Sequence, residues 1–558
     1  MLRPDTISPI PEETARIAHA AFPKGHPYLR LADEFGTLFT DDLFVALFPA
    51  HGQPACAPWR LALATVLQFA EGLSDRRAAD AVRSRIDWKY VLRLELTDPG
   101  FDASVLSEFR TRLLDGQAEQ LLLDTLLTWC RERQLVKARG RQRTDGTGRP
   151  LGRMLAAVRA LNRIEVVGET MRHALNSLAV VAPSWLERHA NPEWVAQYAR
   201  RAEGDRLPTG QAARDALALT IGGDGYALLI ALYSAPAPVW LREVPAVDTL
   251  RRVWIQQYHL VEGTVQWRAA EEIPPATTFI SSPYDLDAHY AKKRTTQWVG
   301  YKVHITETCE DDLPHLVTQV ETMTGPIADG DATPVIHDNL ARRDLLPQTH
   351  LVDTGYLDAE LLVSSRHDYA VDLFGPTRPN MHWQARAGEG FDIQHFRVDW
   401  ERQQATCPEG RTSVSWTPAV DNRHTNVIKI KFSTKDCRSC LSRTRCVRSE
   451  NPHPRRTITV RPQAPYEALQ AARQREGTAT FSATYAKRAG IEGTISREIR
   501  TCRLRRTRYI GLARTRLGHL LTAAALNFLR LGEWFTGSSR AKTRRSPFAT
   551  LMTDLIAA

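Results

Sequence analysis

The chain has 558 residues, 43% of them hydrophobic, and a formal net charge of +10, a composition typical of a soluble protein with several packed cores. No stretch reaches the ~18 uninterrupted apolar residues of a membrane span, and the N-terminus lacks the apolar core of a signal peptide, so we expect a cytoplasmic protein that does not enter a membrane. The excess of Lys and Arg favours a polyanionic partner, because binding to phosphates releases counterions.

Residues 1–138 are predicted to form an all-α N-terminal domain. Apolar residues recur at helical spacing at 43–48 and 61–69. Ser74 or Asp75 is expected to cap a basic helix that contains Arg76 and Arg77. A short helix, a turn and a basic helix would suit a module for DNA binding or dimerisation.

The pattern changes at Arg141–Asp145, which is short and extended. A helix is predicted from Leu155 to Leu178, and helical patterns continue to about Trp267, so we expect a helical insertion at about 156–275 within a domain that covers 139–380. The later elements predicted are strands at 301–305, 316–320, 350–352 and 369–374, with helices at 333–345 and 358–365. Two adjacent strands followed by alternating helices and strands predict a mixed α/β sheet with crossovers.

Asp353 follows the apolar strand 350–352, at the strand end where α/β sheets place functional groups. The run Val352-Asp353-Thr354-Gly355 also matches the turn of aspartic proteases. Those enzymes need a second such turn to pair two carboxylates. The nearest segment, Asp145-Gly146-Thr147, has its residues in a different order, so we exclude the protease.

Residues 381–465 are poor in helical pattern and hold half of the eight cysteines, so they are predicted to form an insertion. Cys437 and Cys440 are separated by two residues, with Cys407 before them and Cys446 after them. Four thiolates in a reduced, polar segment are expected to bind a structural Zn²⁺. Free thiols and an iron–sulfur cluster are the alternatives.

Residues 466–558 are predicted to be helical, with a basic end. Tyr485, Arg488 and Glu492 stand at i, i+3 and i+7, which places them on one helix face. A carboxylate there can reach a metal held by two strand-borne aspartates. From 500 to 516 there are seven arginines and no acid, and the last residues carry a second basic cluster, Arg540, Lys542, Arg544 and Arg545.

Several segments together resemble the DDE transposases of bacterial insertion sequences, in the branch that has a Tyr-Arg-Glu signature. The segments are Leu73–Ala79, Trp298–His304, His350–Tyr356, Arg488–Thr494, Arg508–Leu512 and Thr522–Asn527. The resemblance implies an α/β ribonuclease-H-like catalytic core, accompanied by the all-α N-terminal domain, the helical insertion and the cysteine-bearing insertion. Asp145 would lie on the first strand, Asp353 after the fourth, and Glu492 on the following helix.

By the same resemblance, Asp145, Asp353 and Glu492 are the catalytic residues and hold two Mg²⁺ or Mn²⁺ ions. The ions would activate water to nick the transposon end, and the freed 3′-hydroxyl would then attack target DNA. The implied partners are double-stranded DNA, as terminal inverted repeats and as target, and a second copy of the chain in a homodimer on paired ends. DNA contacts are expected from Tyr485, Arg488, Arg500, Arg505, Arg506 and Arg508.

The chain departs from the family after the first aspartate, where relatives have Ser-Thr-His and this sequence has Gly146–Pro150. Extra residues in a loop add little closure entropy, so Asp145 is expected to face Asp353 and Glu492, with any distortion confined to residues 146–154. The departure motivates two alternatives to an active transposase: a DNA-binding remnant that cannot cut, and a metal-dependent nuclease without strand transfer.

Overall fold

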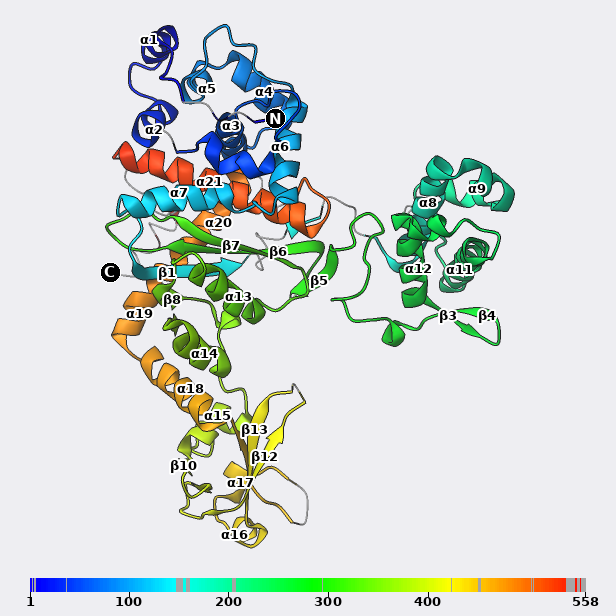
Figure 1. Cartoon of the computed structure of the whole chain (residues 1–558). Coiled ribbons are helices and arrows are strands. Elements are labelled where there is room, and N and C mark those ends of the chain that lie inside the picture. The colour runs from blue at the N-terminus through cyan, green and yellow to red at the C-terminus, as the bar shows by residue number, and fades with distance from the viewer. Residues whose placement is uncertain are drawn as a thin grey trace.

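The structure is a computed structural model, and it describes the chain except residues 3, 5, 6, 37, 147–153, 157–160, 203–206, 294, 423, 450–452, 503, 505, 538–546, 549–551 and 553–558. Figure 1 shows a central body from which two smaller bodies project. The segment after Asp145 that was expected to be distorted and the basic cluster at 540–545 lie largely or wholly outside the described residues.

A mixed sheet forms the centre of the molecule. Its strands are β1 (Arg139–Gly146), β2 (Met154–Leu155), β5 (His289–Lys293), β6 (Thr296–Thr308), β7 (Val317–Thr324), β8 (Pro347–Leu351) and β9 (Asp372–Phe374). The order β7-β6-β1-β8-β9 combines antiparallel pairs, β7 with β6 and β6 with β1, with parallel pairs, β1 with β8 and β8 with β9. This arrangement confirms the predicted mixed α/β sheet and is compatible with a ribonuclease-H-like core.

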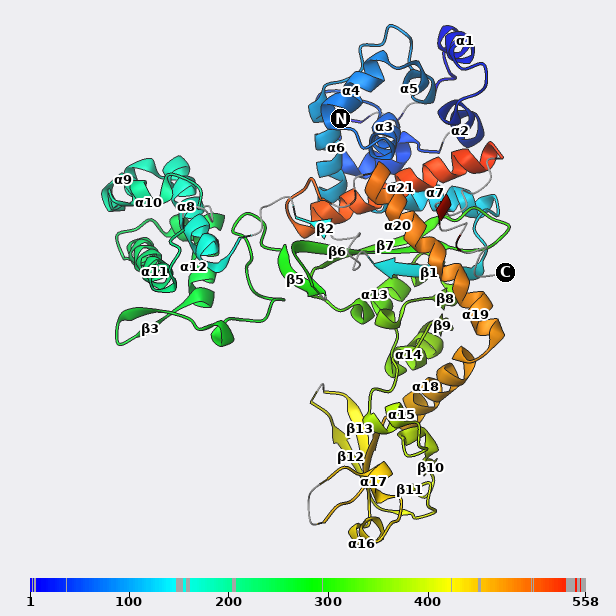
Figure 2. The ribbon, with the colours of Figure 1, turned by 180° about the vertical axis from the view of Figure 1, so that it is seen from behind.

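Helices cover the sheet and supply its crossovers. The helices between the strands are α13 (Asp329–Ala341), η5 (Thr354–Tyr356) and α14 (Ala359–Tyr369). The predicted strand at 369–374 begins later than expected, because Tyr369 still belongs to α14 and Ala370 ends that helix in the left-handed conformation. Figure 2 shows helices α18 (Gln463–Glu476), α19 (Ala479–Tyr485) and α20 (Gly490–Thr501) running along the molecule from the lower body to the sheet.

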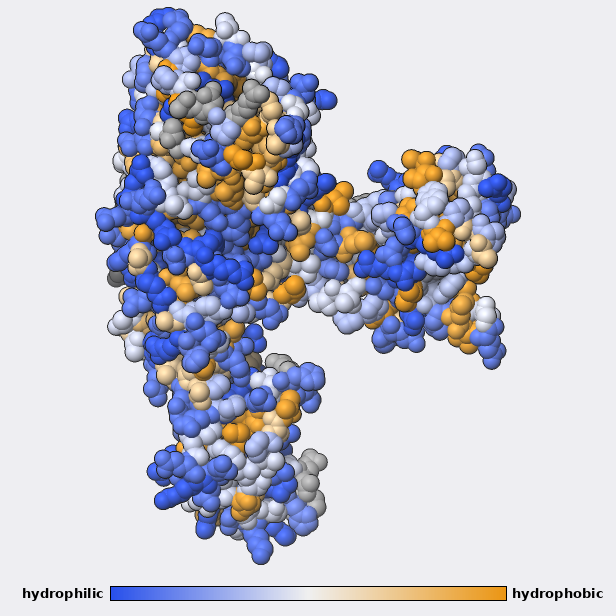
Figure 3. Space-filling model, viewed as in Figure 1, coloured by the Kyte–Doolittle hydropathy of each residue, from blue (hydrophilic) through white to orange (hydrophobic). Residues whose placement is uncertain are grey.

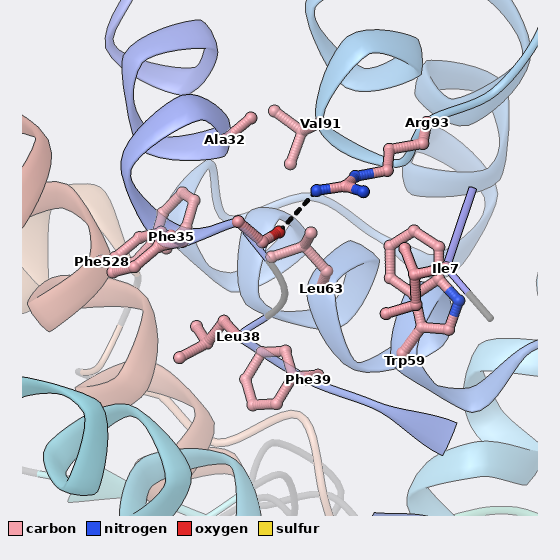
Figure 4. A pocket seen from close by; sticks show the side chains of 11 residues that line it. Ile7, Ala32, Phe35, Leu38, Phe39, Trp59, Leu63, Val91, Arg93 and Phe528 are labelled. Atoms are coloured by element: carbon pink, nitrogen blue, oxygen red, sulfur yellow. Dashed lines mark hydrogen bonds between the residues drawn. The ribbon is translucent and has the colours of Figure 1, made fainter. Parts of the chain in front are cut away.

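The N-terminal elements are all helical and pack on the last long helix of the chain. They are α1 (Glu12–Ala21), α2 (Pro27–Phe35), η1 (Asp41–Leu47), α3 (Pro58–Ala70), α4 (Asp75–Ser84), α5 (Ile86–Val91), α6 (Ala103–Asp115) and α7 (Leu121–Glu132). Ser74 caps α4, as expected. Phe35 stacks on Phe528 with ring centroids 5.4 Å apart, and Arg93 donates to the Gly36 carbonyl (Figure 4). One hydrophobic core therefore joins both ends of the chain to the sheet.

The first projecting body, which we call the helical insertion, lies between β2 and β5 and has its own core. It contains α8 (Arg163–Val181), α9 (Pro183–His189), α10 (Trp194–Tyr198), α11 (Gln211–Tyr233), η3 (Val239–Glu243), α12 (Pro245–Gln257), β3 (Tyr258–Val261), β4 (Thr264–Trp267) and η4 (Ala270–Glu272). The prediction of a helix from Leu155 was wrong: Leu155 pairs with β6, and Asn162 caps a helix that begins only at Arg163. Helices do not continue to Trp267 either, because β3 and β4 form a hairpin.

Helix α11 is the only described helix that is long and apolar enough to cross a membrane by length and composition. A single helix of this kind is weak evidence for a span, because core helices of soluble proteins have the same composition. Figure 3 shows hydrophobic patches among hydrophilic ones on the visible face of the insertion.

The second projecting body, the cysteine-bearing insertion, is mainly β. It contains α15 (Trp383–Ala387), η6 (Ile393–His395), β10 (Arg397–Asp399), β11 (Gln404–Thr406), β12 (Ser413–Val420), β13 (Asn426–Phe432), α16 (Thr434–Arg438), α17 (Arg443–Cys446) and β14 (Thr457–Val460). The chain returns to the sheet through α18 (Gln463–Glu476), α19 (Ala479–Tyr485), η7 (Ala486–Ala489) and α20 (Gly490–Thr501), and then forms α21 (Leu512–Phe535).

Candidate active site

Asp145 and Asp353 are brought together by the register of two parallel strands. Arg143 of β1 pairs with Leu351 of β8, so the residues two positions further along, Asp145 and Asp353, follow the same end of the sheet. The side chain of Asp145 is buried, whereas that of Asp353 is 40% exposed. Each carboxylate accepts a hydrogen bond from the next backbone amide, at 2.8 Å in both cases.

Gly146, directly after Asp145, lies where no side chain fits. A Cβ at this position would stand 2.5 Å from the hydroxyl oxygen of Tyr356 and 2.9 Å from Nδ1 of His304. These two side chains are buried and hydrogen-bonded to each other at 2.6 Å. Burial lowers the pKa of His304 to about 4, so this neighbour of the site is neutral. The glycine therefore allows a close packing of strands β1 and β6 against Tyr356.

The guanidinium of Arg488 lies between Glu492 and the two aspartates. Nη2 of Arg488 lies 2.7 Å from Oδ2 of Asp145 and 3.8 Å from Oδ2 of Asp353, and Nη1 lies 3.5 Å from Oε1 of Glu492. Both aspartates are thus within 3.8 Å of one nitrogen, well inside the ~10 Å that two bridged metal ions can span. The structure gathers the three predicted acids around a single guanidinium.

The electrostatics of Arg488 follow from this position. Its side chain is 6% exposed, and burial disfavours its charge. Asp145, Tyr485, Asp353 and Glu492 outweigh that effect and raise the pKa of Arg488, so the guanidinium stays charged. Among the described residues, no group of three or more His, Cys, Asp or Glu side chains is arranged to hold one metal ion. Arg488 stands between the acids that would form such a group.

A buried network fastens the helix that carries Glu492 to strands β1 and β6. Glu307 is fully buried and pairs with Arg143 at 2.6 Å and with Arg530 at 2.7 Å. Thr494, two residues after Glu492, donates to the same carboxylate at 2.8 Å. These two arginines keep Glu307 ionised and its pKa low against the cost of burial. The sequence pattern does not reveal this network, although strand alternation places Arg143 on the same face as Asp145.

The residues that were expected to contact DNA differ in their exposure and in their packing. Tyr485 is half-buried and stacks on Phe481, with ring centroids 5.5 Å apart. Arg500 and Arg506 are exposed. Arg508 is also exposed, but its Nη1 donates to the carbonyl of Leu73 at 2.6 Å and so links the basic segment to the N-terminal helices. Arg505 lies outside the described residues.

The four cysteines of the insertion line one cavity. Cys407, Cys437, Cys440 and Cys446 share a space of about 220 Å³ with Arg411, Arg443 and Arg456. The backbone N–H of Arg456 donates to Sγ of Cys437 at 3.4 Å. Burial raises the pKa of the Cys446 thiol to about 11. The remaining cysteines lie elsewhere, and Cys130, Cys309 and Cys502 are buried.

Comparison with protein families links both ends of the chain to one activity. Residues 406–532 match the family described as "Transposase DDE domain", and residues 16–112 match "Transposase domain (DUF772)". The first match includes the four cysteines, Arg488 and Glu492, whereas Asp145 and Asp353 lie outside it. Comparisons with curated proteins and with solved structures gave no match. The two transposase domains matched on one chain support a DDE transposase of an insertion sequence.

Proposed function

We propose that this transposase binds the terminal inverted repeats of its element and catalyses metal-dependent strand cleavage, followed by strand transfer to target DNA. The observation that carries the proposal is the meeting of Asp145, Asp353 and Glu492 at one buried guanidinium. The three acids come from strand β1, from the turn that follows strand β8 and from helix α20, which are far apart in the sequence. Ionisable groups that converge on one buried charge in this way are typical of functional sites.

The donor set fits the divalent ions on which DDE domains act. Carboxylate oxygens are the ligands that Mg²⁺ and Mn²⁺ favour, and here three carboxylates already surround a positive charge. Asp145, Asp353 and Glu492 would hold two such ions. When bound, the ions would activate the attacking oxygen and stabilise the leaving one in phosphoryl transfer.

The chain itself would position the acids and the DNA. Strands β1 and β8 hold the two aspartates side by side, and the Glu307 network fixes α20 against β1. Tyr485 and Arg488 would contact the DNA end, and the exposed arginines after α20 would contact phosphates. Residues 1–138 would serve DNA binding and dimerisation, and a homodimer on paired ends in the cytoplasm would complete the assembly.

A structural Zn²⁺ would be held by Cys407, Cys437, Cys440 and Cys446. The support is their convergence on one cavity, together with the N–H that Arg456 directs at Cys437. Thiolate sulfur is a ligand that Zn²⁺ favours, and four such ligands close a structural site. The ion would stabilise the cysteine-bearing insertion and would take no part in cleavage.

The test is an assay of the full-length protein on duplexes that carry the element's ends, with Mg²⁺ or Mn²⁺. Nicked ends that join to target DNA are expected. Asp353→Asn and Glu492→Gln should abolish nicking and leave DNA binding intact, while Asp331→Asn, an exposed acid on α13, should cleave normally. Near-normal nicking by Glu492→Gln would overturn the triad. Binding without nicking by the wild type would indicate a remnant, and nicking without joining would indicate a nuclease.

A further inference from the structure

Arg488 is placed as a cation would be placed among the three acids. Each acid has an oxygen within 3.8 Å of a guanidinium nitrogen, and the guanidinium is almost completely buried. Three carboxylates repel one another, and a central positive charge removes that repulsion. Arginine is suited to this role, because its guanidinium does not lose its proton in proteins.

The guanidinium is held more by charge than by directed hydrogen bonds. Nη1 donates to Glu492 at a long 3.5 Å, and among the described residues Nε and Nη2 have no aligned hydrogen-bond acceptor, although Nη2 lies close to Asp145. A phosphate offers a guanidinium two parallel, charge-assisted hydrogen bonds. Arg488 therefore has a better-aligned anion available in DNA than the acids it now neutralises.

The backbone around Arg488 is suited to a change of position. Arg488 lies in η7, a 3₁₀ segment between helices α19 and α20. Short 3₁₀ stretches inside a helical run often mark a functional hinge. A small rearrangement of η7 that gives up the hydrogen bond from Arg143 to the Lys487 carbonyl would move the guanidinium, while Thr494 and Arg530 keep α20 and Glu492 in place through Glu307.

We propose that Arg488 is a built-in counter-cation of the catalytic acids: it occupies their centre when DNA is absent, and divalent ions enter as its guanidinium leaves for a DNA phosphate. This inference rests on the proposed function of the triad. Divalent ions that bind the acids would displace the Arg488 guanidinium toward DNA, and DNA that binds the guanidinium would free the acids for divalent ions. Metal binding and DNA binding would therefore strengthen each other. The DNA-free enzyme would then bind divalent ions weakly and would be protected from unspecific cleavage.

The experiment measures Mn²⁺ binding to the full-length, DNA-free protein, with free Mn²⁺ followed by electron paramagnetic resonance. Arg488→Gln removes the charge and should bind Mn²⁺ at least tenfold more tightly than the wild type. Arg497→Gln is the matched control, because Arg497 lies on α20, the helix that directly follows η7, and pairs with Glu533 at 2.7 Å instead of with the acids. The control should bind like the wild type. If Arg488→Gln binds Mn²⁺ no more tightly than the wild type, the proposed counter-cation role of Arg488 would be overturned.

A second variant covers the case in which Arg488→Gln does not fold. Arg488→Lys keeps a charge but offers a single ammonium, which cannot reach all three acids, so its Mn²⁺ affinity should be intermediate. Thermal unfolding in chelator should show a lower Tm for Arg488→Lys than for the wild type, and Mn²⁺ should raise that Tm more than it raises the wild-type value. A lysine variant indistinguishable from the wild type in both measurements would contradict the inference.

The same assay separates this inference from the proposed function. Asp353→Asn, added to Arg488→Gln or Arg488→Lys, should remove the gained affinity. Tight binding that survives this change would show that Mn²⁺ binds elsewhere, and the proposed triad would fail. If Asp353→Asn abolishes Mn²⁺ binding but Arg488→Gln leaves it unchanged, the triad would stand as the metal site. Only the counter-cation role of Arg488 would then be overturned.

Discussion

Gly490 lies directly against the guanidinium of Arg143, so that a Cβ at position 490 would stand 2.2 Å from Nη1. The guanidinium cannot easily move aside, because it pairs with buried Glu307 and donates to the carbonyl of Lys487. Gly493, in the next turn of α20, has no atom of the described residues within 4 Å of its Cβ position. The two glycines of this helix thus meet different constraints.

Gly490→Ala should therefore destabilise the protein, by about 1–3 kcal/mol, as overpacking of a core does. Gly493→Ala should stabilise it by up to about 1 kcal/mol, because alanine favours the helix and meets nothing. Urea unfolding of both variants followed by circular dichroism measures the two shifts. Shifts of the same sign would show that Arg143 does not restrict position 490.

Glu498 should make stability fall as the pH rises. Complete burial is the main cause that raises its pKa to about 8; Glu307 adds to the effect and Arg530 opposes it. Because the folded pKa lies above the ordinary value of 4.5 for a glutamate, this group's stabilising contribution is complete below about pH 4.5 and is lost as the pH rises through about 8. Glu498→Gln, which is neutral at every pH, should lose this dependence.

Urea unfolding at pH 6 and pH 9 checks this prediction. As the pH rises from 6, Glu498→Gln should become more stable relative to the wild type. The difference in unfolding free energy should change by up to about 1.4 kcal/mol per pH unit below pH 8. Glu533→Gln, on the more exposed side of α21, is the control and should follow the wild type. Parallel pH profiles for wild type and Glu498→Gln would mean that Glu498 is ionised in the folded protein.

Replacement of Cys437 and Cys440 by Ser should release about one metal ion per chain and lower the Tm of the cysteine-bearing insertion. Metal analysis of the purified protein by mass spectrometry measures the ion, and Cys56→Ser, an exposed cysteine away from the cavity, is the control. The control should retain its metal. Wild-type protein that contains neither zinc nor iron would rule out the metal site.

DNA binding should weaken steeply with salt through the basic segment 500–516, which begins in the last turn of α20. Arg500→Gln combined with Arg506→Gln should lower the slope of log K against log salt by about 2, near 0.9 for each lost phosphate contact. Arg402→Gln is the control, because Arg402 is a solvent-exposed residue of the cysteine-bearing insertion. This variant should leave the slope unchanged. An unchanged slope in the double variant would place the basic segment away from DNA.

Much of the sheet could be predicted from short-range patterns. Alternation and apolar runs identified β6, β7 and β8, and the strand end placed Asp353 where it is found. Errors arose where the pattern was ambiguous over a few residues. The hairpin β3–β4 follows helix α12 without a break, and a short amphipathic strand there resembles a further helical turn.

The sequence by itself determined the local features of this transposase: the strands that end near Asp145 and Asp353, the helical run that carries Glu492, and the spacing of the cysteines. Only the tertiary structure decided that Arg488 lies among the acids, and that Glu307 joins Arg143 to Arg530. Periodicity reports which face of an element is buried, and it acts over a few residues. Which charges meet depends on how segments more than a hundred residues apart share one buried space, where every charge must find a partner.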